Sequence, residues 1–282
     1  MSSMLKLLSV SALASLALFG ATDEQIIKFV KRGLGKNPAI TVKSVKIADR
    51  VLLDNPKGWS AYFITFDLEL KRGKESIDIS DNDIIFAKDN LISPDFIDVR
   101  SNRSIKHRLS PAVKESFYDK EHLLYGSEKA KHKILVFSDP NCPFCKDLVP
   151  PIMEAALKYP DTFALYYYHL PLLKLHPGSL ALCKAMIVLQ KRGQKDLFLK
   201  IYETDFDYSL EEEEKVLKEL NEKLGTDLTK SDIDQPWVTE ALKRDMDRAK
   251  ELFVKGTPTV FIDGKKDPSK EEYRKFIPKG GK

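Results

Sequence analysis

Apolar and polar residues alternate strictly over residues 62–70, the pattern of a strand with one buried face. A stretch rich in β-branched residues at 40–53 predicts another strand before it. A turn at residues 71–74 leads into two short predicted strands, at residues 77–79 and 84–86. Together these segments predict an antiparallel sheet.

A helix precedes this sheet. Residues 22–25, Thr-Asp-Glu-Gln, form a capping box, and apolar positions then recur at helical spacing until Gly33 or Gly35 ends the helix. One helix followed by antiparallel strands predicts a small α+β domain over residues 22–108. It holds no cysteine, no glycine-rich phosphate loop and no cluster of acid–base groups. We therefore expect its role to be structural and not catalytic.

The second half of the chain has a different pattern. Apolar runs at residues 133–138 and 163–169 predict two buried strands. Between them a helix starts at Pro143, and the Pro150–Pro151 pair should bend or interrupt it.

Helical patterns then dominate residues 170–255. The predicted helices cover residues 178–191, 194–202, 209–224, where residues 209–212 read as a capping box, and a segment that starts at Pro236. An Asp263-Gly264 turn joins two last strands, and a final helix follows near residues 269–277. This order predicts an α/β domain over residues 126–282 with a helical insertion.

The two domains need a connection. Ser110 is a good N-cap, Pro111 suits the first helical position, and Gly126 provides a stop. These signals predict a linker helix over residues 109–125; that it is the first helix of the second domain is an equally good interpretation.

Cys142 and Cys145 stand one helical turn apart, directly after the apolar run at residues 133–138. A Cys-x-x-Cys at a strand-to-helix junction is placed for redox exchange. The thiolate is the attacking species, and the positive end of a helix favours it. We expect Cys142 to be the exposed nucleophile and Cys145 the resolving thiol.

Other uses of the pair fit less well. A structural zinc site needs four ligands, yet only Cys183 remains, and the five histidines show no zinc-type spacing. Covalent haem attachment requires a histidine after the second cysteine, where this chain has Lys146. An inert local disulfide is the remaining alternative. We expect no cofactor and no metal.

A second motif supports redox chemistry. Pro258 follows Thr257 and opens a short apolar run that ends at the Asp263-Gly264 turn. Alone, it would suit an ordinary trans proline at the start of an edge strand. Paired with an upstream Cys-x-x-Cys, it resembles the cis-proline loop that faces the dithiol in the thioredoxin fold. Such a loop exposes backbone to which an extended substrate can bind.

Residues 1–21 hold one lysine, an apolar stretch and small residues at the end, the pattern of a secretory signal peptide. An uncleaved anchor is the alternative. With 43% hydrophobic and 31% charged residues the chain is globular, and a net charge of +4 without a basic stripe predicts no nucleic-acid binding. Cys183 lies in an apolar helical stretch, so we expect a buried, inert thiol.

The chain resembles the bacterial periplasmic thiol–disulfide interchange proteins, particularly the DsbC/DsbG branch. Three features carry the resemblance: the block at residues 137–146, Thr257 directly before Pro258, and a separate N-terminal module. It implies a thioredoxin-fold catalytic domain and a cystatin-like N-terminal domain that pairs two chains into a V-shaped homodimer.

The resemblance also implies roles for individual residues. Cys142 attacks, Cys145 resolves, and Thr257 and Pro258 shape the peptide-binding loop, with the intervening Pro143 and Phe144 facing substrate. The implied location is the periplasm, and the implied clients are unfolded or misoxidised exported proteins.

Three functions follow from this reasoning. The first is a disulfide isomerase kept reduced by a membrane electron donor of the DsbD kind. The second is a DsbA-like dithiol oxidase recharged by a DsbB-like membrane protein; the long helical insertion is more like DsbA. The third is a client-binding chaperone with secondary redox activity. The Pro143-Phe144 dipeptide does not decide between the first two.

Overall fold

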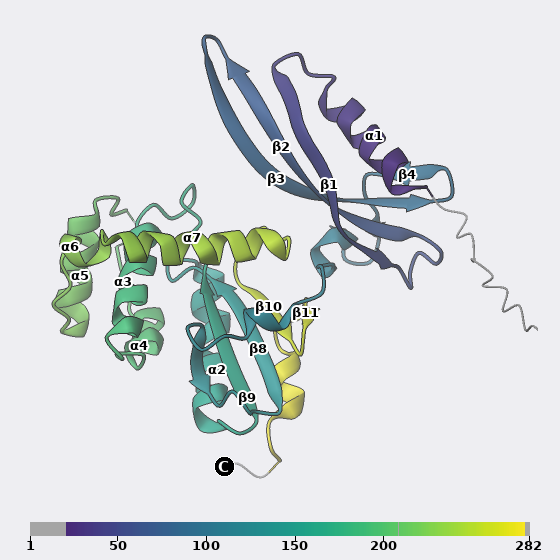
Figure 1. Ribbon diagram of the computed structural model, residues 1–282. Coiled ribbons are helices and arrows are strands. Elements are labelled where there is room, and N and C mark those ends of the chain that lie inside the picture. Colours follow the sequence, from purple (N-terminus) through teal and green to yellow (C-terminus); the bar gives the residue numbers. More distant parts are fainter. Residues whose placement is uncertain (1–20, 208, 280–282) are drawn as a thin grey trace, which may run out of the picture.

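The computed structural model describes residues 21–279 apart from Tyr208. The predicted signal peptide therefore lies outside the described residues, except for Ala21. The N-terminal module (residues 21–108) and the C-terminal domain (residues 115–279) are separate bodies that lie side by side (Figure 1). None of the helices in the described part of the chain is long and apolar enough to cross a membrane.

The N-terminal module is a helix packed on an antiparallel sheet. Its main elements are α1 (Asp23–Leu34), β1 (Ile40–Leu52), β2 (Ser60–Arg72), β3 (Glu75–Lys88) and β4 (Leu91–Ser93), and the strands pair in that order. The predicted capping box is confirmed: the Gln25 amide donates to the Thr22 hydroxyl at 3.3 Å, and the Thr22 amide donates to the Gln25 side chain at 2.8 Å. A small ribbon, β5 (Ile97–Asp98) with β6 (Arg103–Ser104), and a 3-10 helix (Ile105–Arg108) complete it.

One prediction for this module is wrong. The segments at residues 77–79 and 84–86 are parts of one long strand, β3, and not two strands. β3 pairs with β2 continuously from Glu75 to Ala87, so the polar residues at 80–83 remain in the ladder. Backbone pairing along the whole hairpin overrides the local loss of apolar alternation.

The predicted linker helix over residues 109–125 is also wrong. The segment contains only a 3-10 helix (Glu115–Phe117) and the beginning of β7 (Leu123–Gly126), which joins the C-terminal sheet. Phe117 is fully buried, and its carbonyl accepts a hydrogen bond from the Tyr168 hydroxyl at 2.8 Å. Burial of this side chain and the pairing of β7 with the sheet outweigh the local helix signals at Ser110 and Pro111.

The C-terminal domain is built on a five-stranded sheet in the order β11-β10-β8-β9-β7. β8 and β9 are parallel, and the other pairs are antiparallel. Its further elements are β8 (His132–Ser138), α2 (Pro143–Lys158), β9 (Phe163–His169), α3 (Ser179–Lys191), α4 (Leu197–Glu203), α5 (Glu213–Leu224), α6 (Lys230–Ile233), α7 (Pro236–Glu251), β10 (Thr259–Ile262), β11 (Lys265–Asp267) and a 3-10 helix (Glu272–Phe276). This is the predicted strand–helix–strand, helical insertion, strand–strand order.

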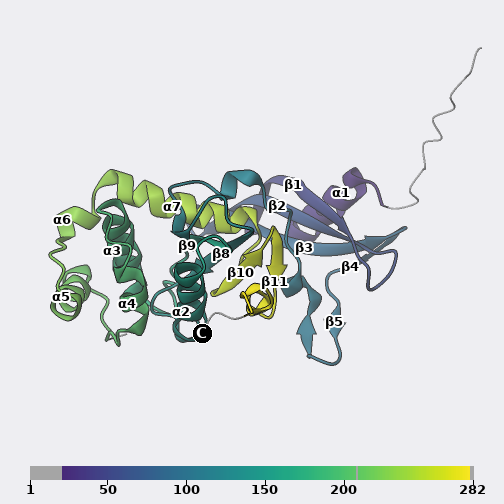
Figure 2. The same cartoon turned by 90° about the horizontal axis from the view of Figure 1, so that it is seen from below.

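Side chains of β8 and β9 alternate between two cores. Ile134 and Val136 face α2 and the inserted helices, whereas Leu135 and Phe137 face the segment around Phe117 and the end of α7. A strand that is buried on both faces reads as a continuous apolar run, which explains why its sequence was recognisable. The helices α3 to α6 gather at the end of the molecule farthest from the N-terminal module (Figure 2).

Three helix details differ from prediction. α2 runs without a break through Pro150 and Pro151, because neighbouring Val149, Ile152 and Met153 are fully buried. α5 starts at Glu213, and no capping box forms at residues 209–212 because the Ser209 hydroxyl donates to Asp207 at 2.6 Å instead. The final helix is a single 3-10 segment.

The two bodies are joined by a shared apolar contact. Phe253 follows α7, and its ring packs edge-on against Phe63 of the N-terminal sheet, with the ring centroids 5.1 Å apart. Nearby, the Asn82 side chain donates to the Lys250 carbonyl at 2.7 Å, and the Lys255 ammonium lies 2.6 Å from Asp81. The end of α7 is thus fixed to the N-terminal module.

Candidate active site

The dithiol lies where the central strand β8 gives way to α2. Cys142 is the N-cap of α2 and Pro143 is its first residue. The Cys142 amide donates to the Asp139 carbonyl at 3.1 Å, and the Cys145 amide donates to the Cys142 carbonyl at 2.9 Å. The first turn therefore begins at Cys142, as predicted, and presents its free amide groups to that sulfur.

Cys142 is less exposed than predicted. Only 4% of its surface is accessible, whereas Pro143 and Phe144 beside it are exposed, Phe144 at 69%. The cause is the loop at Thr257, whose carbonyl lies 3.7 Å from the Cys142 sulfur. The Cys142 sulfur is thus covered, whereas the ring of Phe144 two residues later is exposed.

The predicted cis proline is present. The Thr257–Pro258 peptide bond is cis, and Thr259 of β10 lies opposite Phe137 of β8. That register brings the Thr-Pro pair alongside the start of α2. The Thr259 hydroxyl donates to the Gly256 carbonyl at 2.7 Å and fastens the loop.

The two thiols have opposite protonation behaviour. A hydrogen bond from the Cys145 thiol, together with donors at Thr257 and the amides of Cys145 and Phe144, lowers the pKa of Cys142 to about 5 in spite of burial. The Thr257 hydroxyl is buried and makes no hydrogen bond among the described residues, which leaves it available to the Cys142 sulfur. Burial and the adjacent Cys142 thiolate raise the pKa of Cys145 well above its usual range. Cys142 is therefore ionised at neutral pH, and Cys145 keeps its proton.

A buried hydroxyl network lies beneath Cys145. Ser138 hydrogen-bonds to the Cys145 thiol, and its hydroxyl lies 2.6 Å from that of Tyr202, which in turn lies 2.6 Å from the hydroxyl of Tyr167. All three hydroxyls are buried. The network reaches Cys145 from α4 and β9, and its three residues lie too far apart in the chain for a local sequence pattern to indicate it.

Asp139 holds the loop before the dithiol. Its carboxylate is fully buried and accepts hydrogen bonds from the amides of Asn141 and Leu172, both at 2.8 Å, from the Ser179 hydroxyl at 2.6 Å and from His176 at 3.0 Å. A buried carboxylate with four donors is a rigid anchor. It ties the dithiol loop to the start of the helical insertion.

A cavity of about 690 Å³ adjoins the cis-proline loop. Thr257 and Pro258 form one side, and Ile84, Lys106 and His107 of the N-terminal module lie among the residues that line the other. The cis-proline loop therefore opens onto a groove to which both bodies contribute.

Comparison with known proteins agrees with this geometry. A family model described as thioredoxin matches residues 119–279, and the chain belongs to that family. With a Cys-x-x-Cys at the N-terminus of a helix, it is a thiol–disulfide oxidoreductase. The N-terminal module lies outside the match.

Three proteins are similar to this chain in sequence or in structure. A "probable disulfide bond formation protein D" of Bacillus anthracis is 26% identical over 167 residues, which cover 55% of this chain and 76% of the relative. A thioredoxin-like oxidoreductase of Silicibacter pomeroyi is 21% identical with a TM-score of 0.48, over 56% of this chain and 89% of that one. BdbD of Bacillus subtilis is 18% identical with a TM-score of 0.47, over 59% and 92%.

Proposed function

We propose that this protein is a disulfide donor: its oxidised Cys142–Cys145 pair accepts two electrons from a substrate dithiol, which leaves as a disulfide. The observation that carries the proposal is the set of hydrogen bonds that hold Cys142 as a thiolate at the N-terminus of α2. Stabilising the thiolate stabilises the reduced form, and a dithiol with a stable reduced form is a strong oxidant.

The reaction has two exchange steps. A substrate thiolate attacks the Cys142 sulfur, and Cys145 leaves and takes up a proton. A second substrate thiolate then attacks the mixed disulfide, and Cys142 leaves as a thiolate. The low pKa of Cys142 makes it the better leaving group in that second step.

Two further features support the oxidase direction. The relatives from Bacillus anthracis and Bacillus cereus are both named probable disulfide bond formation proteins. The groove beside Thr257 and Pro258 could take an extended client segment, and the exposed ring of Phe144 offers an apolar contact next to the dithiol. Such work belongs outside the cytoplasm, where disulfides persist, and a DsbB-like membrane oxidant would restore the disulfide.

The N-terminal module favours a second candidate, the isomerase that the sequence predicted. A separate domain that pairs two chains would hold two dithiols around one misoxidised client, and a DsbD-like donor would keep Cys142 reduced. A client-binding chaperone is the third candidate, and it would work without Cys142.

The redox state in the cell separates these candidates. Intact cells that express the full chain are quenched with acid, free thiols are alkylated, and the two forms are resolved by their mass. A donor is expected to be mostly oxidised, and a mostly reduced population would contradict our proposal and favour the isomerase. If the Cys142→Ser variant still protects an unfolding client fully, that result favours the chaperone.

A further inference from the structure

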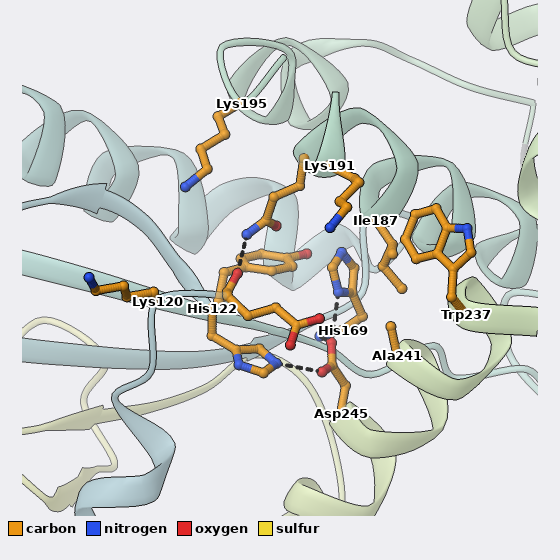
Figure 3. Close-up of a pocket in the computed structure, with 12 residues that line it drawn as sticks. Lys120, His122, His169, Ile187, Lys191, Lys195, Trp237, Ala241 and Asp245 are labelled. Atoms are coloured by element: carbon orange, nitrogen blue, oxygen red, sulfur yellow. Dashed lines mark hydrogen bonds and ion pairs between the residues drawn. The ribbon is translucent and has the colours of Figure 1, made fainter. Parts of the chain in front are cut away.

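A second cavity, of about 470 Å³, lies away from the dithiol between α3, α7 and the end of β9 (Figure 3). Neither cysteine of the dithiol and no residue of the cis-proline loop is among the described residues that line it. Its volume is in the range of small-molecule sites.

The cavity is built on regular helical spacing. Trp237, Ala241 and Asp245 are four residues apart along α7, and Ile187 and Lys191 are four apart along α3, so each set shares one face of its helix. Figure 3 shows these two faces turned toward the same space. Rigid elements therefore supply both an apolar wall and polar groups.

Asp245 fixes the imidazole of His169. One carboxylate oxygen of Asp245 accepts from both the His169 amide and its Nδ1, each at 2.8 Å, and the other oxygen lies 2.8 Å from Nε2 of His122. A carboxylate only accepts hydrogen bonds, so Nδ1 of His169 carries a proton, and Nε2 is the ring nitrogen left for another partner.

That free nitrogen is the unusual feature. His169 is 97% buried, yet its Nε2 has no hydrogen-bond partner among the described residues. Buried polar atoms are nearly always paired, and an exception calls for an absent partner. The Lys191 ammonium points toward this edge of the ring in Figure 3, and Lys191 makes no ion pair with any described residue.

The charges around the cavity are unbalanced. Arg244 lies 2.9 Å from Glu121 and offsets its charge. Burial lowers the pKa of His122, but hydrogen bonds from its ring to Asp245 and Asp119 outweigh this and raise that pKa, which favours the protonated ring beside these two carboxylates. The amines of Lys191 and Lys195 have no such partners among the lining residues, and the cavity is therefore positive.

We propose that this cavity binds a small organic carboxylate with an apolar, preferably aromatic, body. The carboxylate lies between the Lys191 ammonium and Nε2 of His169, which takes up a proton from solvent and donates it to the anion while Asp245 supports the other side of the ring. The body of the ligand rests against Trp237, Ile187 and Ala241. The site is independent of the proposed disulfide donation.

Trp237 provides a direct readout. The chain has two tryptophans, so the Trp59→Phe variant of the full chain leaves Trp237 as the only one. This variant is titrated with phenylacetate, with the neutral phenylacetamide, and with inorganic phosphate while Trp237 emission is recorded. We expect saturable binding of phenylacetate in the millimolar range or below, and binding of phenylacetamide weakened at least about tenfold.

Variants of Lys191 test the charge. In the same background, Lys191→Met should weaken phenylacetate about tenfold and Lys191→Glu more strongly, since a charge-assisted contact is lost and then reversed. Lys218→Met, at an exposed position of α5, is the matched control and should change nothing.

Three results would overturn the proposal: no saturable change with phenylacetate, equal binding of the amide, or unchanged affinity in both Lys191 variants. If inorganic phosphate bound as tightly as phenylacetate, the inference that the ligand needs an apolar body would be wrong. Because the readout is binding, each result stands whether or not the dithiol donates disulfides.

Discussion

The N-terminus of α2 and the middle of α3 each carry a buried cysteine, and the two thiols behave in opposite ways. Cys142 is 4% exposed and Cys183 is fully buried. Burial raises the pKa of Cys183 well above its usual range, and nearby carboxylates add to this effect. At Cys142 a thiol, a hydroxyl and two amides overcome the same burial. Hydrogen-bond donors, and not exposure, therefore decide which sulfur reacts.

The largest expected effect comes from removing the Cys142 sulfur. Cys142→Ser should lower the rate of disulfide exchange with a model dithiol peptide by roughly a thousandfold or more, because an alcohol is a far weaker nucleophile and leaving group than a thiolate. Cys183→Ser is the matched control and should leave the rate unchanged. A large loss in the control would show that Cys183 takes part in the chemistry.

The pH dependence of alkylation sharpens the contrast. The pKa of Cys142 is lowered to about 5, so its thiolate is present above that pH and disappears as the pH falls through it. The rate of iodoacetamide modification of the reduced protein should follow a midpoint near pH 5, and mass spectrometry should find Cys183 unmodified. A midpoint near the usual value of about 8.5 would refute the thiolate.

Removal of a single donor should shift that midpoint. Thr257→Val keeps the shape of the side chain and deletes a buried hydroxyl that makes no hydrogen bond among the described residues. We expect the pKa of Cys142 to rise by about one to two units, the value of a hydrogen bond to a charged group. The same alkylation profile measures it. Thr259→Val, which deletes a hydroxyl bound to Gly256, should shift the midpoint much less.

The network beneath Cys145 should affect only the second thiol. Ser138→Ala removes the hydroxyl that lowers the pKa of Cys145, so release of a mixed disulfide by Cys145 should slow about two- to fivefold. Single-turnover quenching of a preformed mixed disulfide measures this step. The alkylation midpoint of Cys142 should stay in place, and an equal shift there would mean that the network acts on both sulfurs.

The smallest effect is expected for the exposed side chain of Phe144. Phe144 is 69% exposed beside the nucleophile, so Phe144→Ala should raise KM for an apolar peptide substrate about threefold to tenfold with little change in kcat. Leu173→Ala, an exposed apolar residue outside the described motifs, is the control. An unchanged KM would remove Phe144 from the substrate surface.

Much of the fold could be predicted because its signals are local. β9 has the predicted bounds, α2 starts at Pro143, and the Asp263-Gly264 turn has both residues at positive φ, as a two-residue hairpin requires. The dithiol and the cis proline were recognisable for the same reason. Each is encoded within a few consecutive residues.

The wrong prediction and the contacts that were not predicted share a physical cause. Ser110 and Pro111 look like a helix start, but the fate of that segment is decided by the burial of Phe117. Three of the four donors to Asp139, and the contact of Ser138 with Tyr202, come from distant parts of the chain. Only the packing of the inserted helices brings them together, and no local pattern records it.

The position of Phe253 has a mechanical consequence. Phe253 lies four residues before Thr257, in the segment that connects α7 to the cis proline. Its ring packs against Phe63 of the neighbouring body. At its C-terminal end the same segment continues into β10, which pairs with β8 of the central sheet. A rotation of one body against the other would therefore displace the segment that covers the Cys142 sulfur.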